Sequence, residues 1–178
     1  MSIIYFSKYG SVAELWGDGL GWISPELATG VEDDQGASCE GENVWTKYIR
    51  LTNFGFTIPS GCKVSSITVG ARIRCTEMSM PGMEGFLQKS GGNYCEDFGL
   101  SYRFGVGWEW FGMSPDAGKS PCILALTHEE INSPNFGFNF RAYLPVGYTS
   151  KIELDAVNIW IALESGATDY LPLVGMGP

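Results

Sequence analysis

Charged residues are scarce in this sequence, and basic residues are the scarcer kind. Lys, Arg, Asp and Glu make up 17% of 178 residues, with 11 basic and 20 acidic side chains and a net charge of −9. Nucleic-acid binding needs Lys and Arg arrayed against phosphates, so no nucleic-acid partner is expected. No run approaches the ~18 apolar residues of a membrane span, so no membrane partner is expected either. The opening MSIIYFSKYG lacks the pattern of a secretion signal.

Histidine and paired cysteines are also lacking. His128 is the only histidine, and the cysteines are Cys39, Cys62, Cys75, Cys95 and Cys122, with no C-x-x-C spacing. Zinc and dithiol redox sites are therefore not predicted, and the thiols are expected to be buried and reduced. Thr127 to Glu130 read as a capping box, which makes His128 a solvated residue of a short helical turn rather than a catalytic base. Gly118-Lys119-Ser120 has the wrong glycine spacing for a phosphate loop. The sequence predicts no catalytic residue and no cofactor.

Glycine and aromatic residues are plentiful. The chain has 24 Gly and 9 Pro, and 13% of its residues are aromatic, which is typical of an all-β fold with many turns. Three segments are apolar at every second residue, and they run over 64–75, 136–144 and 152–163. In the last, the apolar parity changes after Leu154, and a bulge at Asp155–Ala156 would restore it. One apolar face on each strand needs a second layer, so we predict an antiparallel, jelly-roll-like β-sandwich.

The expected core follows from the same alternation. It consists of Ile67, Val69, Ile73, Phe136, Phe138, Phe140, Val157, Ile159 and Ile161. Further strands are predicted over 43–56, 85–89, 98–111 and 122–126. Residues 1–36 show no sustained period, so they are predicted to be an irregular N-terminal arm. The sandwich is predicted over 37–163, and residues 164–178 form a C-terminal tail. The low charge content favours a homo-oligomer, with a well-packed monomer as the alternative.

Two groups of side chains suggest binding. Trp108 and Trp110 flank Glu109, and tryptophan rings stack on sugars. In a strand both indoles would point away from Glu109, which favours passive glycan binding over glycoside hydrolysis. Acidic residues Glu32, Asp33, Asp34, Glu40 and Glu42 could gather around calcium, but without EF-hand spacing they read as solvated turn acids, and no metal site is predicted.

Several motifs together resemble a β-sandwich domain of tailed-bacteriophage virion proteins. The first is the segment 51–61 (LTNFGFTIPSG), followed by the alternating strand 64–74. The second is Leu126-Thr127 followed by INSPNFGF over 131–138, and the third is LDAV over 154–157 leading into Ile159 to Ile161. Trp22 to Ala37 also resembles the family's Trp-x-x-Pro opening and acidic turn. Ser66 stands where the family usually has glycine. The resemblance covers about two-thirds of the chain.

The resemblance implies a non-enzymatic structural protein of the virion, made in the cytoplasm of the host bacterium. A single domain with arm-like ends favours a capsid decoration (cement) protein, which would bind the major capsid protein and other copies of itself, with a trimer as one arrangement. The predicted interface residues are Trp16, Trp22, Met78, Met80, Met83, Tyr170 and Leu171. The alternative is a tail, baseplate or fibre adhesin that binds host glycan through Trp108 and Trp110.

Overall fold

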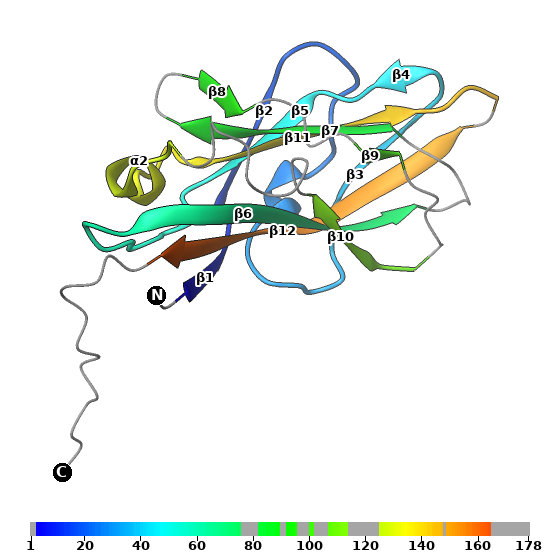
Figure 1. Ribbon diagram of the computed structural model, residues 1–178. Coiled ribbons are helices and arrows are strands. Elements are labelled where there is room, and N and C mark those ends of the chain that lie inside the picture. Colours follow the sequence, from blue (N-terminus) through cyan, green and yellow to red (C-terminus); the bar gives the residue numbers. More distant parts are fainter. Residues whose placement is uncertain are drawn as a thin grey trace.

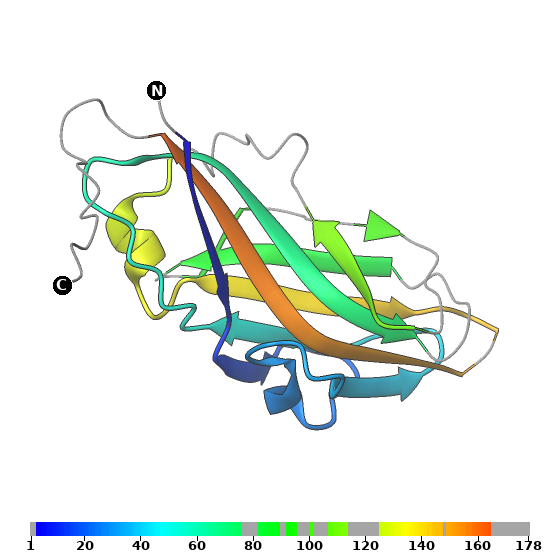
Figure 2. The same ribbon diagram turned by 90° about the horizontal axis from the view of Figure 1, so that it is seen from below.

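The fold of this chain is an all-β sandwich, seen in a computed structural model that describes residues 3–75, 82–89, 92–95, 100–101, 107–113, 125–147 and 149–164. Its strands lie in two antiparallel layers (Figure 1). The predicted fold class is therefore confirmed. Seen from below, strands of the nearer layer cross those of the other obliquely (Figure 2). No helix among the described residues is long and apolar enough to cross a membrane.

The first layer, sheet A, is built on the two longest strands. Among the described residues its order is β1 (Ile3–Tyr9), β12 (Ser150–Glu164), β6 (Lys63–Cys75) and β10 (Glu109–Met113), with β3 (Ala37–Gly41) pairing with the start of β12. The ladder of β6 and β12 shifts register between Leu154 and Ala156, which confirms the predicted bulge at Asp155. Beyond this bulge the apolar side chains of β12 face the core again.

The second layer, sheet B, covers the apolar face of sheet A. Among the described residues its order is β2 (Val12–Trp16), β5 (Tyr48–Thr52), β11 (Gly137–Leu144), β7 (Gly82–Lys89) and β8 (Gly92–Cys95), with β4 (Val44–Trp45) pairing with β11 and β9 (Leu100–Ser101) with β7. All nine predicted core residues are at most 1% exposed. Alternation in three strands thus correctly predicts which side chains meet between the sheets.

The described residues contain two short helical turns. The predicted turn is α2 (His128–Asn132), whose capping box is complete: Thr127 Oγ1 accepts from the Glu130 amide, and the Glu130 carboxylate accepts from the Thr127 amide. A 3-10 turn, η1 (Pro25–Ala28), was not expected from the sequence. Proline at its start fixes a φ angle suited to such a turn.

The N-terminal segment differs from the predicted irregular arm. Residues 3–9 form β1, which pairs with residues 158–164 at the end of β12. Residues 12–16 form β2, which pairs with β5. Alternation is masked here because outward-facing residues of these strands are also apolar, as at Ile3, Tyr5 and Val12, which are 53%, 71% and 39% exposed. The sandwich therefore begins near residue 3 rather than 37, whereas the tail lies outside the described residues beyond Glu164.

Two predicted strands are divided in the structure. The segment 43–56 forms β4 and β5. The second strand ends at Thr52, directly before Asn53, whose φ of 55° is left-handed. The segment 98–111 forms β9 in sheet B and β10 in sheet A, so this stretch passes from one layer to the other. The predicted strand at 85–89 is confirmed within β7. Of the segment 122–126, only Ala125 and Leu126 are described, and neither is in a strand.

Candidate functional site

Three aromatic rings meet on the outer face of sheet A. Tyr9 comes from β1, Trp160 from β12 and Trp110 from β10, and we call these residues the aromatic cluster. The Trp110 ring lies 6.1 Å from the Trp160 ring at 71° and 6.4 Å from the Tyr9 ring at 54°. Trp110 and Trp160 are each 38% exposed. The edge strands β1 and β10 therefore bring rings together over the two central strands, which lie between them in Figure 2.

Small and polar residues form the floor of the aromatic cluster. Gly70 of β6 pairs with Asn158 of β12 and with Gly112 of β10. A Cβ atom on Gly70 would lie 2.7 Å from one atom of the Trp160 ring and 3.2 Å from the Trp110 ring, so only glycine leaves room for both indoles. Asn158 is 2% exposed, and its Oδ1 accepts a 2.8 Å hydrogen bond from the Ser7 hydroxyl.

Trp108 lies on the same sheet but in a different environment. The guanidinium groups of Arg72 and Arg74 lie 5.3 and 4.5 Å from the centre of its ring. Its indole nitrogen is buried and has no hydrogen-bond partner among the described residues. The predicted pair Trp108 and Trp110 is thus divided, because one indole is covered by arginines and the other belongs to the aromatic cluster. Tyr9 and Trp160 are the members that the sequence interpretation missed.

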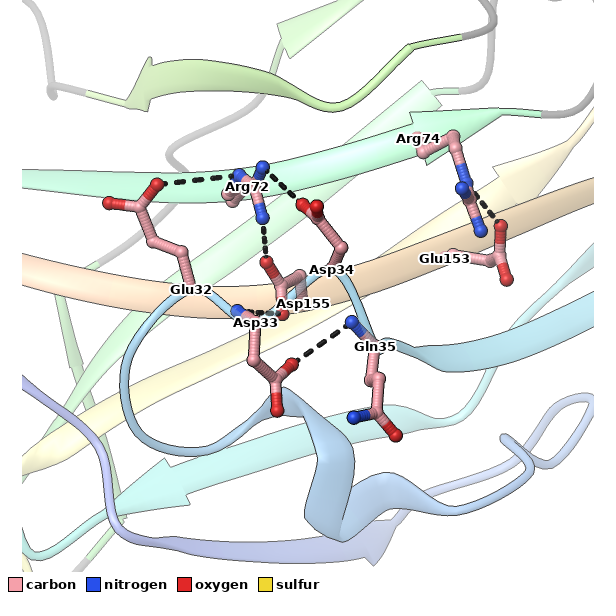
Figure 3. Close-up of polar contacts among 8 residues, drawn as sticks. All are labelled: Glu32, Asp33, Asp34, Gln35, Arg72, Arg74, Glu153 and Asp155. Carbon is pink, nitrogen blue, oxygen red and sulfur yellow. Dashed lines mark hydrogen bonds and ion pairs between the residues drawn. The ribbon is translucent and has the colours of Figure 1, made fainter.

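Arg72 also contacts three carboxylates, two from the acidic turn and one from β12 (Figure 3). It binds the bulge residue Asp155, and its Nη2 and Nε atoms lie 2.6 Å from Asp34 and 3.6 Å from Glu32. The Asp33 amide donates to Asp155 Oδ1 at 3.4 Å. Burial raises the pKa of Asp155 more than Arg72 lowers it. Burial by itself would lower the pKa of Arg72. Its hydrogen bonds to Asp155 and Asp34 have the larger combined effect, so the pKa of Arg72 is raised above its usual value.

In the acidic turn, Glu32 and Asp34 contact Arg72. They face its guanidinium, which already supplies a positive charge. Within the described residues, no group of three or more His, Cys, Asp or Glu side chains is placed to hold a metal ion. Beside this site, Arg74 Nε donates to Glu153 at 2.6 Å, and Lys151 lies 3.1 Å from the same carboxylate (Figure 3 shows the arginine contact).

Aromatic and arginine side chains also pack against one another on the outer face of sheet B. Trp16 stacks on Tyr48 at 4.8 Å and 17°, and its indole N–H donates to Asn139 at 3.1 Å. Arg141 lies 4.5 Å from the Tyr48 ring and binds Glu84 at 2.5 Å. Burial, and then the Glu84 hydrogen bond, raise the pKa of Tyr48 to about 12. Trp16 is only partly exposed and stabilises its own sheet.

Two of the predicted interface residues are core residues of the same chain. Trp22 is 5% exposed, contacts the Phe140 ring at 6.1 Å and donates its indole N–H to the Lys47 carbonyl at 2.8 Å. Met83 is 3% exposed. Their assignment to a surface is therefore corrected, because apolar size predicts burial as readily as an interface. Four others, Met78, Met80, Tyr170 and Leu171, lie outside the described residues.

The remaining reactive side chains have structural surroundings. His128 Nε2 lies 3.0 Å from Glu129 Oε1 within the capping turn, where the sequence placed it. Cys39 and Cys75 are buried, as predicted, and burial raises the pKa of the Cys39 thiol to about 11. Such a thiol is rarely a thiolate at neutral pH and is a poor nucleophile. The Gly118-Lys119-Ser120 segment lies outside the described residues.

Comparisons with known proteins give remote structural likenesses. A scan of protein-family models finds no match, and neither does a search of curated proteins. Among solved structures, this chain is similar to the carbohydrate-binding module CBM29_1 of Piromyces equi, with 12% identity and a TM-score of 0.44 over 96% of this chain and 97% of that one. It is also similar to a family two carbohydrate esterase from Cellvibrio japonicus, with 9% identity and a TM-score of 0.38 over 97% of this chain and 38% of that one.

A third likeness is to the family 11 carbohydrate-binding module of the cellulosomal cellulase Lic26A-Cel5E of Clostridium thermocellum. Identity is 12% and the TM-score is 0.37, over 93% of this chain and 89% of that one. Likenesses this distant do not carry a function from one protein to another.

Proposed function

We propose that this chain is a structural protein of a tailed-bacteriophage particle, and specifically a capsid decoration protein that binds the outer surface of the head and stabilises the shell. The proposal starts from the three sequence motifs that resemble a virion β-sandwich domain. It is supported chiefly by one observation: residues of these motifs, far apart in the chain, are joined to one another by hydrogen bonds.

Asn132 makes the first of these connections. Its Oδ1 accepts from the Ile58 amide at 2.6 Å and its Nδ2 donates to the Ile58 carbonyl at 2.8 Å. Ile58 belongs to the first motif and Asn132 to the second. A side-chain amide that satisfies both backbone groups of one residue replaces a missing strand partner.

Asp155 makes the second connection. It lies in the third motif, at the bulge of β12, and it binds Arg72 of β6 and the Asp33 amide of the acidic turn. The strand after the first motif, the acidic turn and the closing strand thus meet at one carboxylate. The residues of the motif set therefore form a single connected framework.

The framework would act as a rigid body that presents apolar contacts. Ile23, Val31 and Val146 are 67%, 68% and 64% exposed, and they replace Trp22 as candidates for contact with capsid subunits or sister copies. A stable interface buries about 800 Å² on each partner, and repetition over a shell adds avidity. Single contacts of moderate strength would then suffice to reinforce a head.

The experiment is densitometry of purified particles separated into DNA-free heads and tails. A decoration protein is expected in the heads, in numbers comparable to the major capsid protein. In a second measurement, DNA-filled heads assembled without it should release DNA at a lower temperature than DNA-filled heads that carry it. Its absence from heads, or a handful of copies per particle, would contradict the decoration role.

A second candidate is a tail, baseplate or fibre adhesin that binds host surface glycan. The exposed aromatic cluster favours this candidate, because Trp110 and Trp160 present apolar ring surface to solvent on a rigid sheet. Immunogold labelling of intact particles separates the two proposals: label on the tail supports the adhesin, and label over the head supports decoration.

A further inference from the structure

We propose that the aromatic cluster is a binding site for an uncharged pyranose unit of a polysaccharide. The site differs from the Trp108 and Trp110 pair suggested by the sequence, since Trp108 is covered and Tyr9 and Trp160 take part. The inference does not depend on where in a particle the chain lies, or on its being a virion protein.

The first observation in support is that the Trp160 side chain does not pack in the core. Its neighbours Ile159 and Ile161 are fully buried between the sheets, whereas Trp160 points outward and is 38% exposed. Outward positions of a sheet facing water usually hold polar residues. Two indoles and a phenol gathered on such a face keep large apolar ring surface exposed, and binding sites for small organic ligands are lined in this way.

The angles between the rings set the shape of ligand that fits. Trp110 and Trp160 are nearly perpendicular at 71°, and Tyr9 is tilted by 54° from Trp110. Coplanar rings would suit a flat surface such as a crystalline fibre, but these rings form walls. The floor between the walls lacks a side chain at Gly70, and any Cβ there would strike the rings. A shallow site with two walls suits one sugar ring, whose C–H face can lie against an indole.

Hydrogen-bonding groups are available at the rim. Within the described part of the chain, the side-chain N–H groups of Trp110 and Trp160 donate to no protein acceptor, although both residues make ring contacts. Thr68, which pairs with Trp160 across β6 and β12, adds a hydroxyl on the same face. Indole N–H groups are donors only, and a hydroxyl both donates and accepts. Sugar hydroxyls can satisfy either kind of group.

Charge selects the class of sugar. Arg72 is the cross-strand partner of Trp110, and it is already bound by Asp155, Asp34 and Glu32. Arg72 therefore offers no unpaired positive charge to a carboxylate or sulfate. A net charge of −9 also repels anionic polymers at long range. Neutral hexose polymers are the complementary ligands.

The experiment is native affinity electrophoresis of the full chain in gels cast with hydroxyethylcellulose, glucomannan, galactan or dextran, and with polygalacturonate as the anionic comparison. At least one neutral polymer is expected to retard the chain, and polygalacturonate is not. Trp110→Ala and Trp160→Ala should each weaken retardation by up to about tenfold, the scale of one aromatic contact. Tyr5→Ser is the matched control, because Tyr5 is 71% exposed on the same face of β1 but lies four residues from Tyr9.

Gly70→Ala tests whether binding depends on the positions of the two indole rings. This variant keeps both indoles but displaces the Trp160 ring, so retardation should fall as it does in Trp160→Ala. Circular dichroism confirms that each variant is folded. In the unmodified chain, indole N–H resonances of Trp110 and Trp160 should shift with the retarding polymer's oligosaccharide, while that of buried Trp22 should not.

Three results would overturn the proposal. One is that no neutral polymer in the panel retards the unmodified chain. Another is that Gly70→Ala and Trp160→Ala migrate like the unmodified chain. The third is that sedimentation velocity shows a dimer that Trp160→Ala converts to a monomer, because the cluster would then be covered by a second copy. Each result uses the isolated chain, so failure here leaves the particle measurements on the virion role unaffected.

Discussion

Phe138 shows how closely single residues are fitted in this core. It is fully buried in β11, and its ring lies over Gly85 of β7, where an added Cβ would meet a ring carbon at 2.7 Å. Next to it, a Cβ on Gly137 would collide with the carbonyl oxygen of Leu51. Side chain and backbone are therefore interdependent: β11 carries large rings only because its neighbours leave space for them.

Replacing Phe138 by Ala should lower the free energy of unfolding by about 3–5 kcal/mol, because a ring is removed from a packed site that cannot collapse fully. Equilibrium denaturation in urea measures the change. Tyr5→Ala is the control, since Tyr5 is 71% exposed and its loss should cost less than about 0.5 kcal/mol. A cost below ~1 kcal/mol for Phe138→Ala would mean that the site relaxes around the missing ring.

The candidate site shows what could be learned from sequence at the level of residues. Trp108 and Trp110 attract attention because they are two apart, but adjacency does not reveal that Arg72 and Arg74 cover one of them. Trp160 carries a weaker signal: it is an aromatic residue at an outward position of an otherwise well-patterned strand. Tyr9 carries none, because residues of β1 are apolar on both faces. Pairing between distant strands, rather than local pattern, assembles this cluster.

At the scale of elements, the bulge in β12 is the feature on which sheet A depends. The parity change at Leu154 predicts it, but the sequence does not reveal its partner. Asp155 is fully buried, and Arg72 is the cation that compensates it; the Arg72 side chain is 15% exposed. A charged group at this depth is tolerated only while it is paired.

Arg72→Met should therefore destabilise the fold by about 3 kcal/mol, because it leaves Asp155 buried without its partner. Without Arg72 the pKa of Asp155 rises further, so the folded variant keeps a proton that the unfolded chain releases. Its stability should then fall as pH rises from about 4 towards 7, and the deficit against the unmodified chain should grow over that range. Thermal melts at several pH values measure this.

Arg74→Met is the matched control for Arg72→Met. Arg74 also lies over Trp108, but it is 34% exposed, and its buried partner Glu153 keeps a second cation, Lys151, at 3.1 Å. Loss of Arg74 should therefore cost clearly less than loss of Arg72, about 1 kcal/mol. A double variant, Arg72→Met with Asp155→Leu, should recover part of the loss. Equal deficits for the two arginine variants at every pH would refute the role assigned to Asp155.

Helix α2 is the other element with a charge that can be tested. The Lys89 hydrogen bond at 2.6 Å and the Thr127 amide lower the pKa of Glu130 from its ordinary value of 4.5. Glu130→Gln keeps the capping geometry but loses the pair with Lys89, so it should cost about 0.5–1 kcal/mol at pH 7. A lowered pKa contributes stability above about pH 4.5 that disappears as pH falls through the folded value.

The difference between Glu130→Gln and the unmodified chain should therefore be constant from pH 7 to about pH 5 and shrink below 4.5. Denaturation curves across this range provide the measurement. Glu129→Gln, in the same turn and 71% exposed, should differ little from the unmodified chain at pH 7. A gap that widens under acid would show that Glu130 does not interact as described.

At the scale of the whole molecule, the alternation of β6, β11 and β12 was enough to predict two packed layers, since a strand with one dry face needs a partner sheet. The ends of the domain were not predictable in this way. Ile3 and Tyr5 expose apolar side chains to the outside of β1, while Phe6 packs against the core. A strand that is apolar on both faces shows no alternation, so an integral strand was interpreted as an arm.

Removing residues 1–9 distinguishes a strand from an arm. β1 pairs with β12 from Asn158 to Glu164 and places Phe6 against the core. The truncated chain should therefore lose much of the ~5–15 kcal/mol that holds a domain folded, and leave an unpaired edge on β12 that aggregates. Soluble yield and melting temperature measure this loss, and Ile3→Ser is the control because that side chain is 53% exposed. A detachable arm would instead leave the melting temperature unchanged and weaken only binding to other subunits. A truncated chain that melts like the full one would mean that β1 adds nothing to the stability of sheet A.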